Sequence, residues 1–75
     1  MKLVTLDVRG LKRPLPSLLA RRALARLPGG SEMVVLSDDP LAAIDLPHMC
    51  RQEGYDVLEV DRQRELIRLV LRRPL

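Results

Sequence analysis

Apolar and polar residues alternate at three places along the chain, which is the pattern of β-strands that bury one face. The first run, LVTLDV, spans residues 3–8. The other two, YDVLEVD and ELIRLVLRR, are joined by the short polar segment RQR, and this spacing predicts an antiparallel hairpin. The positions of the last run that we expect to face the core are Ile67, Leu69 and Leu71, with Arg68 and Arg72 outside.

Three further elements are predicted between the first strand and the hairpin, and the first two are a helix and a strand. Residues 15–27 are rich in Leu, Ala and Arg, which form helices readily, and the PGG at 28–30 is expected to stop that helix. The segment SEMVVLSD has three apolar residues in succession and predicts a buried strand. The expected core face of the helix consists of Leu19, Ala20, Ala23, Leu24 and Leu27.

Pro47 decides how the segment DDPLAAIDLPHMCRQEG is interpreted. A proline deep inside a helix removes a backbone hydrogen bond, so we expect a loop or a single turn through Ala43. A second helix is then predicted to begin with Asp45 as its N-cap and to run to about Glu53. Gly54 is expected to end it in the left-handed conformation that glycine tolerates.

The order strand, helix, strand, helix, strand, strand predicts an α+β fold. The expected architecture is a two-layer α/β sandwich, βαβαββ, with a four-stranded mixed sheet and two helices on one face. A length of 75 residues predicts one domain, residues 1–75. So small a core leaves no room for a deep cavity, so function is expected on the surface or in a shallow groove.

The composition limits which cellular compartment and which kinds of binding partner are expected. A single cysteine, Cys50, excludes an internal disulfide and a zinc site built on several thiolates, and it fits a reducing cytoplasm. The first residues, MKLVTLDVRG, lack the long apolar run of a signal peptide, and no stretch approaches the ~20 apolar residues of a membrane span. A net charge of +3 and one aromatic residue, Tyr55, argue against direct nucleic acid recognition.

Several motifs together resemble the TusA/SirA-like sulfur carrier family, over about residues 6–72. They are LDVRGLKRPLP, the Leu- and Ala-rich helix after it, SDDPLAAIDLPHMCRQEGYDV and the closing hairpin. The resemblance implies a two-layer sandwich and a role in a persulfide relay, without a cofactor. In such proteins a cysteine just before Pro-x-Pro accepts sulfur from a cysteine desulfurase or a rhodanese and passes it to an acceptor such as a thiouridylase. The pathways implied include tRNA thiolation and sulfur oxidation.

In this chain the motif reads Arg13, Pro14, Leu15, Pro16, so arginine stands where the resemblance places the acceptor cysteine. A guanidinium has no nucleophilic sulfur and stays protonated in proteins. We therefore expect no sulfur transfer through position 13 and assign no catalytic residue. Three interpretations are open: a carrier whose thiol has been replaced, a noncatalytic relative that keeps a docking surface, and an anion-binding site.

Two surfaces are candidates for binding. Cations just before a helix N-terminus attract phosphate, sulfate or thiosulfate, although such cations are also commonly only solvated loop residues. The candidate anion-binding residues are Arg9, Lys12, Arg13 and Ser17. An apolar centre with a cationic rim is typical of a protein-docking patch, and scattered surface leucine is the alternative. The candidate docking residues are Leu15, Leu18, Arg21, Arg22 and Arg26.

The remaining polar candidates have simpler structural interpretations. Cys50 is expected in the core, where a thiol reacts slowly. His48 has no evident partner ligands and is interpreted as a surface residue, and no metal site is expected. Asp38 and Asp39 precede Pro40 and indicate a turn. Asp7 and Arg9 are candidates for an ion pair at the end of the first strand.

Overall fold

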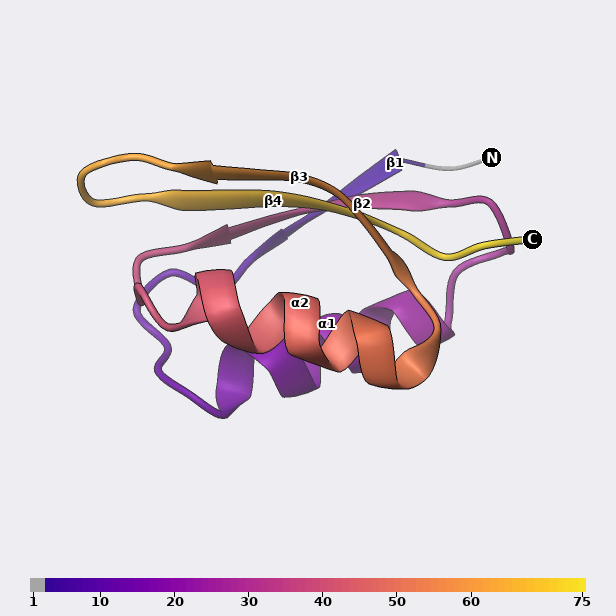
Figure 1. The fold of residues 1–75 in the computed structure, drawn as a ribbon, viewed down its shortest axis with the longest axis horizontal. Helices are drawn as coiled ribbons and strands as arrows, with labels where there is room; N and C mark the ends of the chain where they lie inside the picture. The colour runs from indigo at the N-terminus through magenta and orange to yellow at the C-terminus, as the bar shows by residue number, and fades with distance from the viewer. Residues whose placement is uncertain (1–2) are drawn as a thin grey trace.

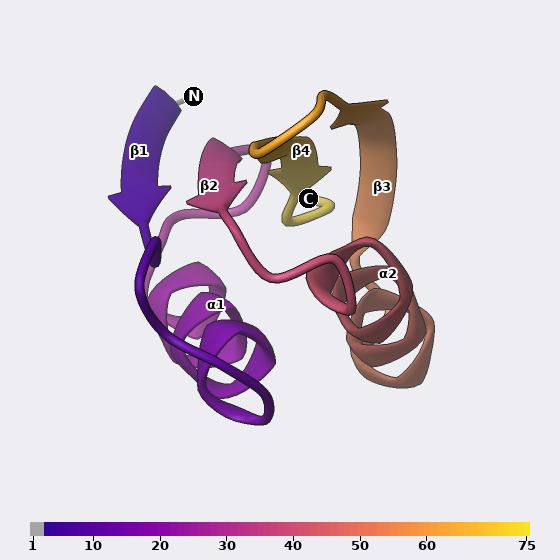
Figure 2. The same ribbon diagram turned by 90° about the vertical axis from the view of Figure 1, so that its left-hand side faces the viewer.

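The computed structural model describes residues 3–75 and confirms the predicted fold. Its elements are β1 (Leu3–Asp7), α1 (Leu15–Ala25), β2 (Glu32–Ser37), α2 (Ala42–Glu53), β3 (Asp56–Arg62) and β4 (Ile67–Arg72). The strands form one sheet in the order β1-β2-β4-β3, in which β1 pairs parallel to β2 and the other pairs are antiparallel. Figures 1 and 2 show both helices beneath the same face of the sheet. Within residues 3–75, neither helix has the length and apolar character needed to cross a membrane.

The core lies between the sheet and the two helices. The predicted inner face of β4 is confirmed, because Ile67, Leu69 and Leu71 are all buried. They pack with side chains from β2 and from both helices. The other fully buried apolar side chains include Leu24, Met33, Val35, Leu46 and Cys50.

β2 is the strand predicted for the segment SEMVVLSD, but only one of its faces is buried. Its burial alternates, with Met33 and Val35 buried and Val34 partly exposed, because both helices lie on one side of the sheet. The open face is covered in part by ion pairs between the hairpin strands. These join Arg72 to Asp56, at 2.8 Å, and Arg68 to Glu59. Long charged side chains of this kind can shield apolar neighbours from water.

α1 ends at Ala25, two residues before the predicted Leu27. Of the expected core face, Ala20 and Leu24 are fully buried, whereas Leu19, Ala23 and Leu27 are partly buried against the core. The end of the helix is bound by Arg73, which follows β4. Its Nη1 donates to the carbonyl oxygens of Ala25 and Leu27, each at 2.7 Å. A cation at the carbonyl end of a helix is electrostatically favourable.

The predicted start of α2 is wrong: the helix begins at Ala42, and Asp45 is not its N-cap. The preceding turn starts the helix, because the Leu41 N–H donates to Asp39 Oδ1 and the Ala42 N–H donates to the Asp39 carbonyl oxygen. Pro47 lies inside the helix, where it supplies no N–H donor. The core-facing residues before and after it remain buried.

The end of α2 agrees with the prediction. Gly54 follows Glu53 with a φ of 78°, in the left-handed region, and its N–H donates to the Cys50 carbonyl oxygen. A residue with a Cβ would be strained at this φ, so the glycine is needed for the chain to leave the helix and enter β3.

Candidate functional site

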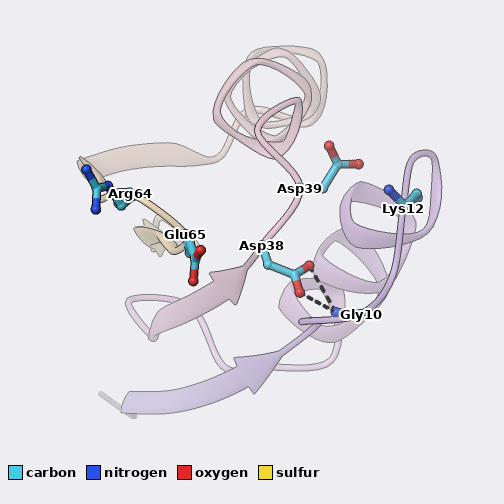
Figure 3. A pocket seen from close by; sticks show the side chains of 6 residues that line it. All are labelled: Gly10, Lys12, Asp38, Asp39, Arg64 and Glu65. Carbon is cyan, nitrogen blue, oxygen red and sulfur yellow. Dashed lines mark hydrogen bonds between the residues drawn. The ribbon is translucent and has the colours of Figure 1, made fainter.

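The candidate site lies where two loops meet at one end of the sheet. Because β1 and β2 are parallel, their carboxyl ends lie side by side, and so do the segments that follow them. Residues 8–14 lead from β1 to α1, and residues 38–41 lead from β2 to α2. Figure 3 shows the second segment, with Asp38 and Asp39, beside the first, with Gly10 and Lys12.

α1 begins at the Pro-Leu-Pro motif. Pro14 is the N-cap, and its carbonyl oxygen accepts the Leu18 N–H at 3.1 Å and the Ser17 hydroxyl at 3.1 Å. Pro16 lies in the first turn, where its missing N–H costs no helical hydrogen bond. The Leu15 N–H donates to the Lys12 carbonyl oxygen at 3.0 Å. The motif therefore forms a firm helix start directly after residue 13.

Arg13 precedes that helix start and points toward solvent, with 60% of its side chain exposed. Its guanidinium binds Asp45 of α2, with Nε 3.2 Å from Oδ2 and Nη2 3.2 Å from Oδ1. Its backbone N–H donates to Asp39 Oδ2 at 3.1 Å. Sequence reasoning missed both partners, because it treated Asp45 as a helix cap and Asp39 as an ordinary turn residue.

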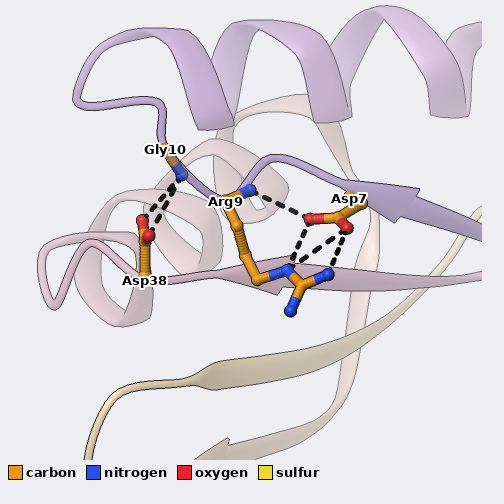
Figure 4. Close-up of polar contacts among 4 residues, drawn as sticks. All are labelled: Asp7, Arg9, Gly10 and Asp38. Atoms are coloured by element: carbon orange, nitrogen blue, oxygen red, sulfur yellow. Dashed lines mark hydrogen bonds and ion pairs between the residues drawn. The ribbon is translucent and has the colours of Figure 1, made fainter.

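The candidate anion-binding residues do not form one set of free donors. Arg9 is bound to Asp7, with its Nη2 2.8 Å from Oδ2 and its backbone N–H 3.0 Å from Oδ1, as Figure 4 shows. The Ser17 hydroxyl donates to a carbonyl oxygen, and Arg13 is bound to Asp45. The predicted pair between Asp7 and Arg9 is confirmed. The hydrogen bonds from Arg9 lower the pKa of Asp7 to about 2.

Lys12, the last of the candidate anion-binding residues, lines a shallow pocket that is also lined by acidic side chains. The pocket has a volume of about 440 Å³ and lies between the β1–α1 loop and the β3–β4 hairpin (Figure 3). Its lining residues are Gly10, Lys12, Asp38, Asp39, Arg64 and Glu65. Three carboxylates against two cations give this pocket no preference for an anion.

The candidate docking residues lie along the exposed side of α1. Leu15 and Leu18 are 45% and 44% exposed. Both line a groove of about 480 Å³, together with Leu19, Arg21, Arg22, Ala25 and Glu53. Arg26 is exposed just past the end of the helix. Within residues 3–75, none of the three arginines forms an ion pair, so their charges are available to a partner.

A second shallow pocket, of about 220 Å³, joins this groove to position 13. Leu18 and Arg21 line both, and Arg13 and Asp45 line the smaller one. The side chain at position 13 and the exposed face of α1 therefore belong to one continuous surface. We call this surface the α1 face: Arg13, Leu15, Leu18, Arg21 and Arg22.

Cys50 and His48 occupy the places predicted for them. Cys50 is 0% exposed, and burial raises the pKa of its thiol to about 11, with a smaller contribution from the nearby charge of Asp56. His48 lies on the exposed side of α2. Among residues 3–75, no three His, Cys, Asp or Glu side chains are grouped closely enough to hold a metal ion.

Comparison with known proteins gives the family. The family model for sulfurtransferase TusA matches residues 4–73, which is almost the whole chain. The chain belongs to the TusA family. Two relatives from Neisseria meningitidis, one from serogroup A and one from serogroup B, are named as candidate sulfur carrier proteins. Each is 43% identical to this chain over 67 residues, covering 89% of this chain and 90% of the relative.

A solved structure is similar to this TusA-family chain as well. The crystal structure of the SirA-like protein from Desulfitobacterium hafniense has a TM-score of 0.83 and 27% sequence identity, and the match covers 96% of this chain and 99% of that one. The resemblance read from the motifs is thus confirmed for both family and fold.

Proposed function

We propose that this TusA-family protein acts in a persulfide relay by docking on relay proteins through its α1 face, and that it accepts no sulfur at position 13. The observation that carries the proposal is the exposed Arg13 at the start of α1, on the same surface as Leu15 and Leu18. A helix N-terminus stabilises a thiolate or persulfide anion, so a cysteine there would be activated. An arginine there can bind a partner but cannot carry sulfur.

The one thiol of the chain does not replace the missing one. Cys50 is fully buried, and a pKa of about 11 leaves almost no thiolate at neutral pH. Since the thiolate is the reactive form and a donor protein needs access to it, both observations support a protein without a working sulfur acceptor.

The chemistry of the α1 face supports a protein partner. Leu15 and Leu18 provide apolar area for burial. Arg21 and Arg22, which form no ion pair within residues 3–75, favour a partner surface with carboxylates. By family membership, the expected partners are a cysteine desulfurase or a rhodanese as donor and a thiouridylase or another protein as acceptor. Relays that serve tRNA thiolation or sulfur oxidation, in the cytoplasm, fit this role.

Restoring a cysteine tests the proposal. Arg13→Cys and the unchanged protein would each be incubated with a cysteine desulfurase and its substrate and then examined by mass spectrometry. We expect an adduct of about 32 Da, a single sulfur atom, at residue 13 of the variant and none on the unchanged protein. Arg13→Ser, which has a hydroxyl in place of the thiol, is the matched control. An adduct on the unchanged protein, or none on Arg13→Cys, would contradict the proposal.

Docking is tested separately from sulfur acceptance. The unchanged protein should bind the desulfurase, and reversing charges on the α1 face with Arg21→Glu and Arg22→Glu should weaken that binding. The matched control is Arg51→Glu and Arg62→Glu, which makes the same change of charge at exposed positions of α2 and β3 that line neither the groove nor the pocket at position 13. If both variants lost binding to the desulfurase equally, the α1 face would not be the docking surface.

A further inference from the structure

The loop that carries position 13 has few hydrogen bonds of its own. Within residues 8–14 it has one backbone bond, from the Leu11 N–H to the Val8 carbonyl oxygen at 3.2 Å. Gly10 turns the chain with a φ of 84°. The two ends of the loop are held, because the Val8 N–H donates to the Leu36 carbonyl oxygen and the Leu15 N–H donates to the Lys12 carbonyl oxygen. The residues between these ends need contacts from elsewhere in the fold to keep one conformation.

Two consecutive aspartates from the other loop hold it in place. Asp38 accepts the Gly10 N–H with both carboxylate oxygens, at 3.0 and 3.1 Å, as Figure 4 shows. Asp39 accepts the Arg13 N–H with Oδ2 at 3.1 Å. These contacts join residues 28 and 26 positions apart in the sequence, so they fix the β1–α1 loop to the start of α2.

Asp39 is itself held on several sides. Its other carboxylate oxygen, Oδ1, accepts the Leu41 N–H at 3.0 Å, and its own N–H donates to Ser37 Oγ at 3.1 Å. Ser37 is fully buried at the end of β2. The carboxylate thus ties the backbone of residue 13 to the turn that starts α2, and the backbone N–H of Asp39 joins the same residue to the sheet through Ser37. A carboxylate with both oxygens bound to backbone N–H groups is a strong and directional acceptor.

We infer that Asp39 is the positioning residue of the site at position 13, with Asp38 as a second anchor at Gly10. The inference rests on the proposed function, because it concerns how that site is presented to a partner. Asp39 acts on the backbone, so it orients residue 13 whichever side chain stands there. The contact between Arg13 and Asp45 is different, because it involves the side chain and is lost when the arginine is replaced.

The electrostatic state of Asp39 agrees with this role. Hydrogen bonds from the Leu41 and Arg13 N–H groups lower its pKa, and the charges of Lys12 and Arg13 act in the same direction. The side chain is therefore ionised, and a full acceptor on both oxygens, at the pH of a cell.

Backbone relaxation measured by NMR tests the inference without any partner. In the unchanged protein the amide of residue 13 should have an order parameter near the ~0.85 of rigid backbone. Asp39→Ala should lower it toward ~0.6 or less, and Asp39→Asn, which keeps one strong acceptor oxygen, should give an intermediate value. Asp61→Ala is the matched control, since Asp61 is an exposed aspartate on β3. An order parameter at residue 13 that is the same in all four proteins would overturn the inference.

Binding to a purified cysteine desulfurase completes the test. Asp39→Ala should weaken binding roughly fivefold, as expected when a hydrogen bond of about 1 kcal/mol no longer holds the docked conformation, whereas Asp61→Ala should bind like the unchanged protein. If Asp39→Ala loosens residue 13 but binds equally well, Asp39 does not position the site for docking. If the unchanged protein does not bind at all while the NMR result holds, the proposed function fails and the loop anchor stands.

Discussion

At the scale of single residues, position 13 and position 50 have opposite surroundings. Arg13 lies at the surface, where its charge is solvated and paired with Asp45, whereas Cys50 lies in the core, where its thiol is shielded. Position 13 is exposed but has no nucleophilic side chain, whereas Cys50 has a nucleophilic thiol that is not exposed. This contrast separates the chain from what its motif leads one to expect.

The buried thiol gives a prediction about reactivity. Cys50 should react with a thiol reagent only when the protein unfolds, because the folded core excludes the reagent and suppresses the thiolate. The measurement is the reaction rate with a disulfide reagent at increasing urea. Arg13→Cys provides the comparison, since its new thiol should react at once without denaturant. Rapid reaction of the unchanged protein in buffer would show that Cys50 is accessible.

The same thiol predicts a dependence of stability on pH. Its pKa rises from 9.0 to about 11 on folding, so the unfolded chain releases the proton first as the pH increases. The free energy of unfolding should therefore fall as the pH rises from about 9 to 11, and this contribution is fully present below pH 9. Cys50→Ala should show a shallower decline than the unchanged protein over that range. Parallel declines in urea unfolding would contradict the raised pKa.

At the scale of elements, the two helices begin by different means. α1 begins where Pro14 and Pro16 fix the backbone, and α2 begins where Asp39 and Pro40 form a turn. In α2 a second proline, Pro47, lies further along and interrupts the hydrogen bonding. A proline at or before the start of a helix thus stabilises the helix, whereas a proline further along removes a backbone hydrogen bond and destabilises it.

A pair of proline substitutions tests this difference. Pro47→Ala should raise the free energy of unfolding by about 1 kcal/mol, because the regained hydrogen bond outweighs the greater freedom of the unfolded chain. Pro40→Ala should lower the free energy of unfolding by about 0.5 kcal/mol, because its only effect is to give the unfolded chain more conformational freedom. Both are measured by urea unfolding. A loss of stability in Pro47→Ala as large as that in Pro40→Ala would show that α2 gains nothing from an N–H at position 47.

At the scale of the whole molecule, α1 contributes one side to the core and the other side to the surface. The inner side of α1 closes the core over the sheet, and its outer side forms most of the α1 face. Leu24 is fully buried on the first side and Leu18 is half exposed on the second. Stability and docking can therefore be altered independently on the same element.

Two leucine substitutions separate these roles. Leu24→Ala should lower the free energy of unfolding by about 2–5 kcal/mol, because it leaves a cavity in the core. Leu18→Ala should change it by no more than about 0.5 kcal/mol, and should instead weaken binding to a relay partner. Chemical unfolding measures the first effect and titration with a desulfurase the second. A large loss of stability in Leu18→Ala would place that side chain in the core.

The sequence was sufficient for the fold because its strongest signals are local. Alternation defined β1, β3 and β4, and a run of helix formers between prolines and glycines defined α1. The start of α2 was missed because the penalty of Pro47 was weighed without the buried residues on both sides of it, which keep the helix intact. The partners of Arg13 were missed because Asp39 and Asp45 come near it only through tertiary contacts, which no local pattern records.

The position of β4 between β2 and β3 affects how the protein is made. The sheet has no link between its two halves until Ile67–Arg72 has been synthesised, because β2 and β3 do not pair with each other. During translation the apolar sides of the earlier strands would stay exposed until β4 has been made and pairs with them. A nascent chain that stalls before residue 67 should accordingly be a target for chaperones, and one released after Arg72 should not.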